Sequence, residues 1–177
     1  MARYSKILLS IPEGVEVKTE DRLVMVKGEK GKLQATIPPG IIVAIQKDKI
    51  AIKSKNNEKE NEKFIGLLFH LTKNMIVGVT KGFEKELELN GVGYKMSVKG
   101  QIVNLQLGYS HDILYHLPEG VTAKVDGNKI LIKGIDKEIV GRAADKIRGY
   151  RPVEPYKAKG FKYTNEVVIR KAGKSSA

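Results

Sequence analysis

An internal repeat constrains the fold of this 177-residue chain more than any other feature of its sequence. With an offset of eighty residues, IPPGI at residues 37–41 aligns with LPEGV at residues 117–121, and KIAIK at residues 49–53 aligns with KILIK at residues 129–133. Gly28 aligns with Gly108 in the same register. Three matches in one register, each followed by a helical pattern, indicate that a structural unit has been duplicated.

Within each repeat, apolar residues alternate with polar ones at a period of two, which is typical of strands with one buried face. In the first repeat the alternating residues are Val15, Val17, Thr19, Val24, Val26, Ile50 and Ile52. In the second they are Leu87 and Leu89, followed by residues 102–107, 121–125 and 130–132. Asp126-Gly127-Asn128 lies between two of these strands, and such an Asp-Gly sequence predicts a hairpin.

Each repeat is expected to end in one helix. After the polar residues 56–63, the first helix has an apolar stripe formed by Phe64, Leu67, Leu68, Leu71 and Met75. The second has Asp136 as its N-cap. The residues expected to face a sheet are Ile139, Val140, Ala143, Ala144 and Ile147. Strands followed by a single helix predict the α+β class, as two tandem similar domains, each a small, mainly antiparallel sheet covered on one face by a helix. With the joint at Gly82 and Phe83, the domains are residues 1–82 and 83–177.

The composition favours a nucleic-acid partner. The chain has 32 Lys and Arg against 20 Asp and Glu, a net charge of +12 and a pI near 9.7. It contains no cysteine, which excludes disulfides, zinc-thiolate sites and iron-sulfur clusters and fits a reducing compartment. The apolar residues 64–79 are interrupted by His70, Lys73 and Asn74, so we expect no transmembrane segment, and the N-terminus has no signal-peptide pattern. Binding to an anionic membrane surface would need a basic amphipathic helix, which the main basic cluster does not form.

That basic cluster is the segment of residues 148–163, called the basic segment below, in which two prolines prevent a helix. Its cations are suited to phosphates: Arg148, Arg151, Lys157, Lys159 and Lys162. Its rings can pack on riboses or bases, or be buried as anchors: Tyr150, Tyr156, Phe161 and Tyr163. From Arg142 to the C-terminus, ten Lys or Arg face three Asp or Glu, a self-repulsion that a polyanion relieves. The alternative is a merely solvated segment whose rings pack on the neighbouring domain.

No pattern in the sequence predicts catalysis, a metal site or a cofactor. Ser110, His111 and Asp112 are adjacent in an extended chain, so their side chains point to opposite faces and cannot form a catalytic relay. Gly91-Val92-Gly93 has Met96 where a dinucleotide fingerprint needs its third glycine. We therefore expect no enzyme and no small-molecule substrate.

Several motifs resemble, in order and spacing, the bacterial-type large-subunit ribosomal protein L6 family. They are GVGYK at residues 91–95, LGYSH at 107–111, GIDK at 134–137, EPYKAKG at 154–160 and MIVGVTKGF at 75–83. The resemblance covers nearly the whole chain. The chain departs from the family pattern at Ala158, where glycine is usual, at Phe161, where an aliphatic residue is usual, and at Asp112, where proline is usual.

The resemblance implies a ribosomal scaffold without catalysis. Such proteins bind 23S-type rRNA mainly through the C-terminal domain and its tail (about 150–177), beside neighbouring large-subunit proteins near the stalk base and factor-binding region. By position, the rRNA contacts would be Tyr156, Lys157, Lys159, Gly160 and Lys162. Arg148, Arg151 and Tyr163 are added from charge and proximity, and Gly91, Gly93 and Tyr94 are candidates for which a structural turn is an equal explanation. The expected location is a ribosome of the cytoplasm or of an organelle.

Two other classes stay open. One is a non-ribosomal module that binds another RNA or DNA, although a DNA-recognition helix would need a basic face that the non-helical basic segment does not supply. The other is an enzyme whose site is assembled from residues far apart in the sequence.

Overall fold

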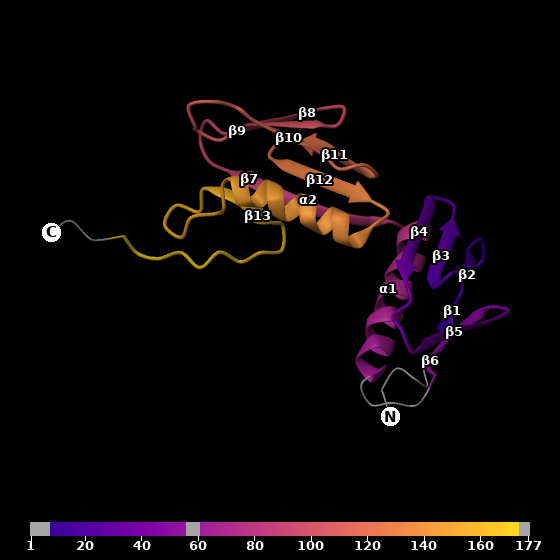
Figure 1. The fold of residues 1–177 in the computed structure, drawn as a ribbon. Helices are drawn as coiled ribbons and strands as arrows, with labels where there is room; N and C mark the ends of the chain where they lie inside the picture. The colour runs from indigo at the N-terminus through magenta and orange to yellow at the C-terminus, as the bar shows by residue number, and fades with distance from the viewer. Residues whose placement is uncertain (1–7, 56–60, 174–177) are drawn as a thin grey trace. The chain divides into compact units, whose positions relative to one another are not determined.

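The computed structural model describes residues 8–55 and 61–173 (Figure 1). It divides the chain between Gly82 and Phe83 into two compact units, called unit 1 and unit 2 below. Within the described residues each unit contains antiparallel sheets and one helix, so the α+β class is confirmed. In each unit the strands form two sheets, where the sequence suggested one.

In unit 1 two antiparallel sheets share one helix. Its strands are β1 (Leu9–Ser10), β2 (Glu16–Glu20), β3 (Leu23–Gly28), β4 (Gly31–Thr36), β5 (Ile41–Gln46) and β6 (Lys49–Ser54). They form sheets in the orders β1-β6-β5 and β2-β3-β4. The helix α1 (Glu62–Thr80) packs against β3, β4 and β6. Val24, Val26 and Ile50 share a buried core with Leu68 and Val79 of the helix.

The buried face of α1 differs from the expected stripe. Leu68 and Met75 are buried as expected, but Leu67 is 51% and Leu71 38% exposed. The residues that face the core are Ile65, Leu68, Phe69, Thr72, Met75, Ile76 and Val79. Apolar residues occur on nearly every side of this helix, so its periodicity alone could not identify the face that packs on the sheets.

In unit 2 the same plan is extended by one strand. Its strands are β7 (Phe83–Asn90), β8 (Lys95–Lys99), β9 (Ile102–Gln106), β10 (Ile113–His116), β11 (Val121–Asp126), β12 (Lys129–Gly134) and β13 (Gly160–Tyr163). The sheets have the orders β10-β9-β8 and β11-β12-β7-β13. The helix α2 (Lys137–Tyr150) packs against β7, β12 and β13 and crosses their face in Figure 1.

The hairpins of the two units show the duplication directly. In β5–β6, Gln46 pairs with Lys49, and in β11–β12 Asp126 pairs with Lys129, eighty residues later. The predicted Asp-Gly-Asn hairpin is confirmed, since Gly127 has a φ of 57° and lies in the turn. Each sequence repeat therefore corresponds to one structural unit.

The N-cap of α2 is also confirmed. The Asp136 carboxylate accepts hydrogen bonds from the backbone N–H groups of Glu138 and Ile139, at 2.7 and 3.5 Å. The core-facing side of this helix is close to the expected one, with Val140, Ala143, Ala144 and Ile147 buried and Ile139 packed at the margin. Asp136 and the small alanines thus fix where α2 begins and which side lies on the sheet.

Candidate nucleic-acid interface

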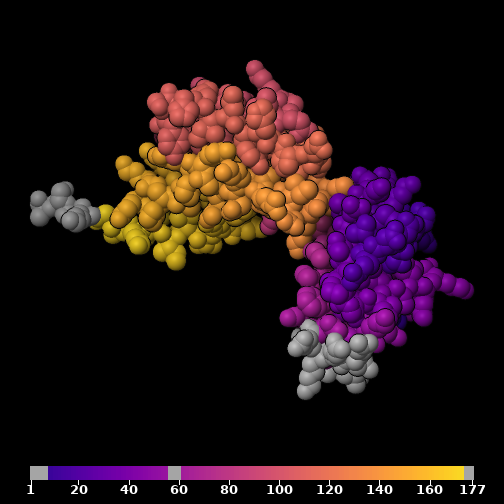
Figure 2. Space-filling view, viewed as in Figure 1, coloured from indigo at the N-terminus to yellow at the C-terminus, as the bar shows by residue number. Residues whose placement is uncertain are grey.

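The basic segment returns along unit 2 after α2 and does not extend freely into solvent. The Phe161 N–H donates to the Arg151 carbonyl at 2.8 Å, and the Val153 N–H donates to the Phe161 carbonyl at 3.2 Å. Farther out, the Glu154 N–H donates to the Lys159 carbonyl at 2.9 Å. These bonds close a loop at residues 154–159. In Figure 2 the yellow C-terminal part of the chain lies against the orange surface of the same unit.

Gly160 begins β13 and is held by backbone on both sides. Its φ is 123°, and a Cβ at this position would lie 2.6 Å from the carbonyl oxygens of both Arg151 and Pro152. Gly160 was expected among the rRNA contacts. Its place in the structure also requires glycine, because β13 packs closely against the chain that leaves α2.

Phe161, the next residue, is fully buried in the unit 2 core. It pairs with Leu89 as β13 adds to the edge of β7. This strand was not predicted from the sequence, because it has only four residues and follows a proline-rich stretch. Phe161 stands where the family usually has an aliphatic residue. Its larger ring therefore packs in the core of unit 2.

Three of the expected RNA-contacting side chains are engaged within unit 2. The Lys162 ammonium lies 3.2 Å from Glu88, and both side chains are less than a quarter exposed. The Arg148 guanidinium donates to Glu166 at 2.7 Å and lies 5.5 Å from the centre of the Tyr163 ring. The pKa of Glu166 is held below its ordinary value, mainly by the hydrogen bond from Arg148 and to a smaller extent by the one from the Tyr163 N–H. These contacts fasten residues 163–166 to α2.

Tyr156, Lys157 and Lys159 lie on the loop at residues 154–159. Tyr156 is 56% exposed, Lys157 is exposed and Lys159 is partly exposed. Among the described residues neither lysine has a salt-bridge partner, and the Glu154 carboxylate is occupied by the backbone N–H of Lys157 at 3.0 Å. The two ammonium groups are consequently available to an external anion.

Arg151 brings together two motifs that are far apart in the sequence. Its guanidinium lies 5.8 Å from the ring centre of Tyr94 and 5.2 Å from that of Tyr109. Hydrogen bonds with Tyr109 and then Tyr94 raise the pKa of Arg151 above its ordinary value. The Tyr109 hydroxyl also donates to the carbonyl of Tyr150, at 2.9 Å. The loops before β8 and before β10 thus meet the end of α2.

The two glycines before Tyr94 shape this meeting point differently. A Cβ on Gly91 would lie 2.5 Å from the Tyr94 ring, so Gly91 lets the ring fold back over the turn. Gly93 has a φ of 83° and open space around it. Both have left-handed backbone conformations that favour glycine, which supports the structural reading of this motif.

A hollow of about 580 Å³ lies at the meeting point, and we call it the aromatic hollow. Its lining includes Tyr94, Tyr109 and Arg151, with Glu154, Lys157 and Lys159 on the loop. Tyr109 was absent from the residues expected in the site. Its signal was present in the sequence, as the tyrosine of the LGYSH motif that carried part of the family resemblance.

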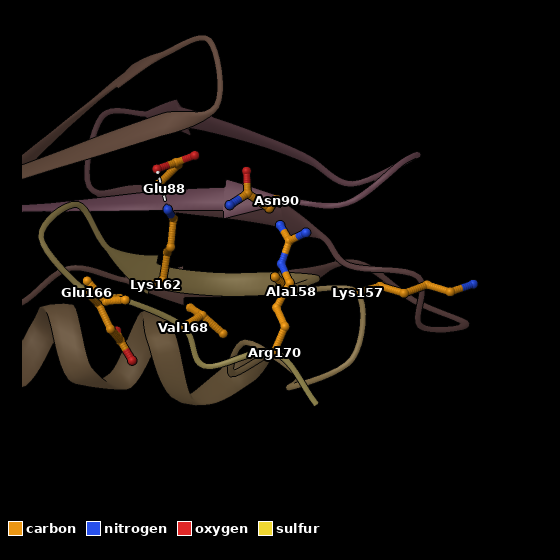
Figure 3. Close-up of a pocket in the computed structure, with 9 residues that line it drawn as sticks. Glu88, Asn90, Lys157, Ala158, Lys162, Glu166, Val168 and Arg170 are labelled. Carbon is orange, nitrogen blue, oxygen red and sulfur yellow. Dashed lines mark ion pairs between the residues drawn. The ribbon is translucent and has the colours of Figure 1, made fainter. Parts of the chain in front are cut away.

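A second hollow, of about 650 Å³, lies along β13 (Figure 3). Lys157 lines it as well, together with Asn90 and the Lys162–Glu88 pair. Arg170, another residue that sequence reasoning missed, points toward Asn90, while Lys157 extends away from the strand. The chain carrying Arg170 is held here by a hydrogen bond of 2.8 Å from the Lys171 N–H to the Pro155 carbonyl. Cations therefore line both hollows.

The Ser-His-Asp sequence does not form a catalytic relay. Ser110 Oγ lies 3.4 Å from His111 Nδ1, but the Asp112 carboxylate accepts hydrogen bonds from Asn104 and Gln106 instead. No group of three or more His, Asp or Glu within the described residues could hold a metal ion. Neither helix in that part of the chain is long and apolar enough to cross a membrane.

Comparison with known proteins gives matches along nearly the whole chain. The family model described as Ribosomal protein L6 matches residues 11–82 and 90–164. The large ribosomal subunit protein uL6 of Geotalea uraniireducens is 46% identical over 176 residues, covering 99% of this chain and 98% of that protein. The protein of the same name from Geobacter sulfurreducens is 47% identical over 176 residues with the same coverage. The protein of the same name from Sulfurovum sp. is 58% identical over 95 residues, which cover 54% of this chain and 53% of that protein.

Proposed function

Since the chain belongs to the ribosomal protein L6 family, whose members are structural constituents of the large ribosomal subunit and not enzymes, we propose that it binds 23S-type rRNA through unit 2. The proposed contact surface is the loop at residues 154–159 with the two hollows beside it. Its cations are Arg151, Lys157, Lys159 and Arg170. Tyr156 is the exposed ring of the same loop.

One observation carries this proposal. Lys157 and Lys159 have no salt-bridge partner within the described residues, although most other cations of the basic segment are paired or packed on rings. Concentrating unpaired positive charge on one short loop raises the energy of the free protein, and a polyanion offsets it. Phosphate contacts of this kind position a protein on RNA without reading its sequence.

The finer location is part of the same proposal. A position near the stalk base and the factor-binding region, beside neighbouring large-subunit proteins, is supported by the family resemblance. The relatives named above are bacterial, which supports a cytoplasmic ribosome.

Titration of protein-free 23S-type rRNA at increasing salt tests the proposal. Each phosphate contact releases counterions, so we expect the affinity to fall steeply with salt. Small-subunit rRNA serves as the matched control and should bind more weakly at moderate salt. Equal affinity for both RNAs and for duplex DNA would favour a general nucleic-acid-binding module, and an affinity independent of salt would contradict the electrostatic basis of the proposal.

A further inference from the structure

We propose that the aromatic hollow receives an unpaired nucleotide of the bound RNA, with its base against the tyrosine rings and its phosphates beside Lys157 and Lys159. This inference rests on the proposed rRNA binding and specifies the kind of RNA feature that this site takes. The alternative occupant is the phosphate backbone of a double helix.

The first argument is the shape and lining of the site. The hollow has a volume of about 580 Å³, the size of pockets that hold small ligands, and it is open to solvent, so a base that projects from an RNA surface can enter it. Unpaired bases are the part of RNA that splays out and stacks on aromatic rings or on the guanidinium plane of arginine. Tyr94, Tyr109 and Arg151 supply both kinds of surface.

The second argument is that these surfaces are held in place before any ligand arrives. Tyr109 is 45% exposed, yet its hydroxyl is fixed by the Tyr150 carbonyl. Arg151 lies against both rings, and Gly91 lets Tyr94 fold over its turn. Rigid rings lose little conformational entropy when a base stacks on them.

The third argument is the presence of Glu154 in the lining. A carboxylate repels phosphate, so it does not suit a site for backbone alone. Glu154 Oε1 accepts the Lys157 N–H, and the second carboxylate oxygen can accept a hydrogen bond from the amino group of a base, as acidic side chains do when they recognise cytosine. The mixture of rings, cations and one carboxylate matches the parts of a whole nucleotide.

The fourth argument comes from the duplication. The two units differ at this place. Residues 29–30 alone join β3 to β4 in unit 1, whereas residues 107–112 join β9 to β10 in unit 2 and include Tyr109. The longer connection is an addition to the shared plan, and it presents a ring that is 45% exposed.

Photochemical cross-linking of the full chain on protein-free 23S-type rRNA tests the inference. Short-wavelength UV joins an aromatic side chain to a base that stacks on it, and mass spectrometry then identifies the linked residue and nucleotide. We expect a cross-link at Tyr109 or Tyr94. The linked nucleotide should be reactive to 2′-hydroxyl acylation in the free RNA, as an unpaired nucleotide is, and protected in the complex.

The rRNA affinity of two variants at Tyr109 gives a quantitative test. Tyr109→Ala should weaken rRNA binding about tenfold, with a salt slope within about one unit of the parent's, because a stacking surface is lost while Arg151, Lys157 and Lys159 keep their charges. Tyr109→Phe keeps the ring and should keep most of the affinity. Leu114→Ala, which removes a 59% exposed side chain from β10 of the same unit, is the matched control and should bind like the parent.

The outcomes separate this inference from the proposed function. If the parent binds rRNA with a steep salt dependence but neither tyrosine cross-links, or the linked nucleotide is paired in the complex, the hollow does not take an unpaired nucleotide and rRNA binding still stands. Parental affinity in Tyr109→Ala likewise overturns the inference alone. A parent protein that does not bind 23S-type rRNA overturns both. Because the cross-link is measured on the parent, a variant that fails to fold does not obscure the result.

Discussion

Glu166 accepts a hydrogen bond of 2.7 Å from the guanidinium of Arg148, so the chain beyond β13 is tied to the last turn of α2. The same carboxylate accepts the backbone N–H of Tyr163 at 3.0 Å. One side chain thus holds together the helix, the end of the strand and the start of the C-terminal residues. The charge of Glu166 decides how firmly this part of unit 2 is docked.

Acid should loosen this docking. The folded-state pKa of Glu166 is lowered, so its pairing contributes stability above the ordinary glutamate value of 4.5 and loses it as the pH falls through the lowered pKa. NMR of the Tyr163 amide should show a transition in this acid range that disappears in Glu166→Gln. Glu138→Gln, at an exposed pair with Arg142 on the same helix, should leave that transition in place. An unchanged transition in Glu166→Gln would mean that another group controls the docking.

Gly160→Ala should detach β13. The added methyl would meet two carbonyl oxygens at a left-handed φ, and we expect a loss of about 2 kcal/mol or more in the free energy of unfolding. Urea denaturation followed by circular dichroism measures it. Gly149→Ala is the control, because Gly149 lies in α2 with open space around it and alanine there should stabilise by about 0.5 kcal/mol. Equal stability of the two variants would contradict the packing role of Gly160.

Ala158→Gly should stabilise the loop. Ala158 has a φ of 54°, where a side chain costs roughly 1–2 kcal/mol, and the greater freedom of glycine in the unfolded chain offsets part of the gain. We expect a net increase of about 0.5 kcal/mol and unchanged rRNA affinity. Ala123→Gly on β11 should instead destabilise, by about 1 kcal/mol, because a strand favours a side chain. A destabilised Ala158→Gly protein would show that the buried methyl outweighs the backbone strain.

Lysines of the basic segment should separate into two groups. Lys157→Ala with Lys159→Ala should leave the melting temperature unchanged and lower the slope of log affinity against log salt by about one unit per lysine. Lys162→Ala should mainly weaken β13, because its ammonium pairs with Glu88.

Exposed lysines on other strands of unit 2 provide the control for this experiment. A double variant at Lys99 and Lys124 removes the same charge from β8 and β11 and should change the salt slope little. If both double variants lower the slope equally, the loop is not the contact surface. The measurement is a salt titration of rRNA binding alongside thermal unfolding.

Residues 83–177 expressed alone should fold and bind rRNA. Unit 2 has its own buried cluster, which includes Leu87, Ile130, Ile147 and Phe161. A domain of this size is small, so some loss of stability is expected without loss of structure. Dispersed amide resonances and a salt slope like that of the full chain would show this. A disordered fragment would mean that unit 1 is needed for folding.

Local sequence determined the elements whose signals lie within a few residues. Asp126-Gly127-Asn128 predicted a hairpin because its turn needs a left-handed residue, and Asp136 predicted a helix start because its carboxylate reaches the next backbone N–H groups. The repeat at eighty residues predicted two similar units of the α+β class. Each of these signals can be recognised in the sequence alone. The turn and the N-cap depend on residues that are neighbours along the chain, and the repeat is recognised by comparing the chain with itself.

Tertiary structure alone decided which members of the basic segment are free. Lys162 and Lys157 have the same chemistry, but only Lys162 lies on a strand that brings it to Glu88. Tyr109 reaches Arg151 because the strands of unit 2 bring their distant loops together. Side-chain type and periodicity describe a residue and its neighbours, whereas these contacts depend on strand pairing between segments more than forty residues apart. That pairing is fixed by burial of the whole core, so no local pattern contains it.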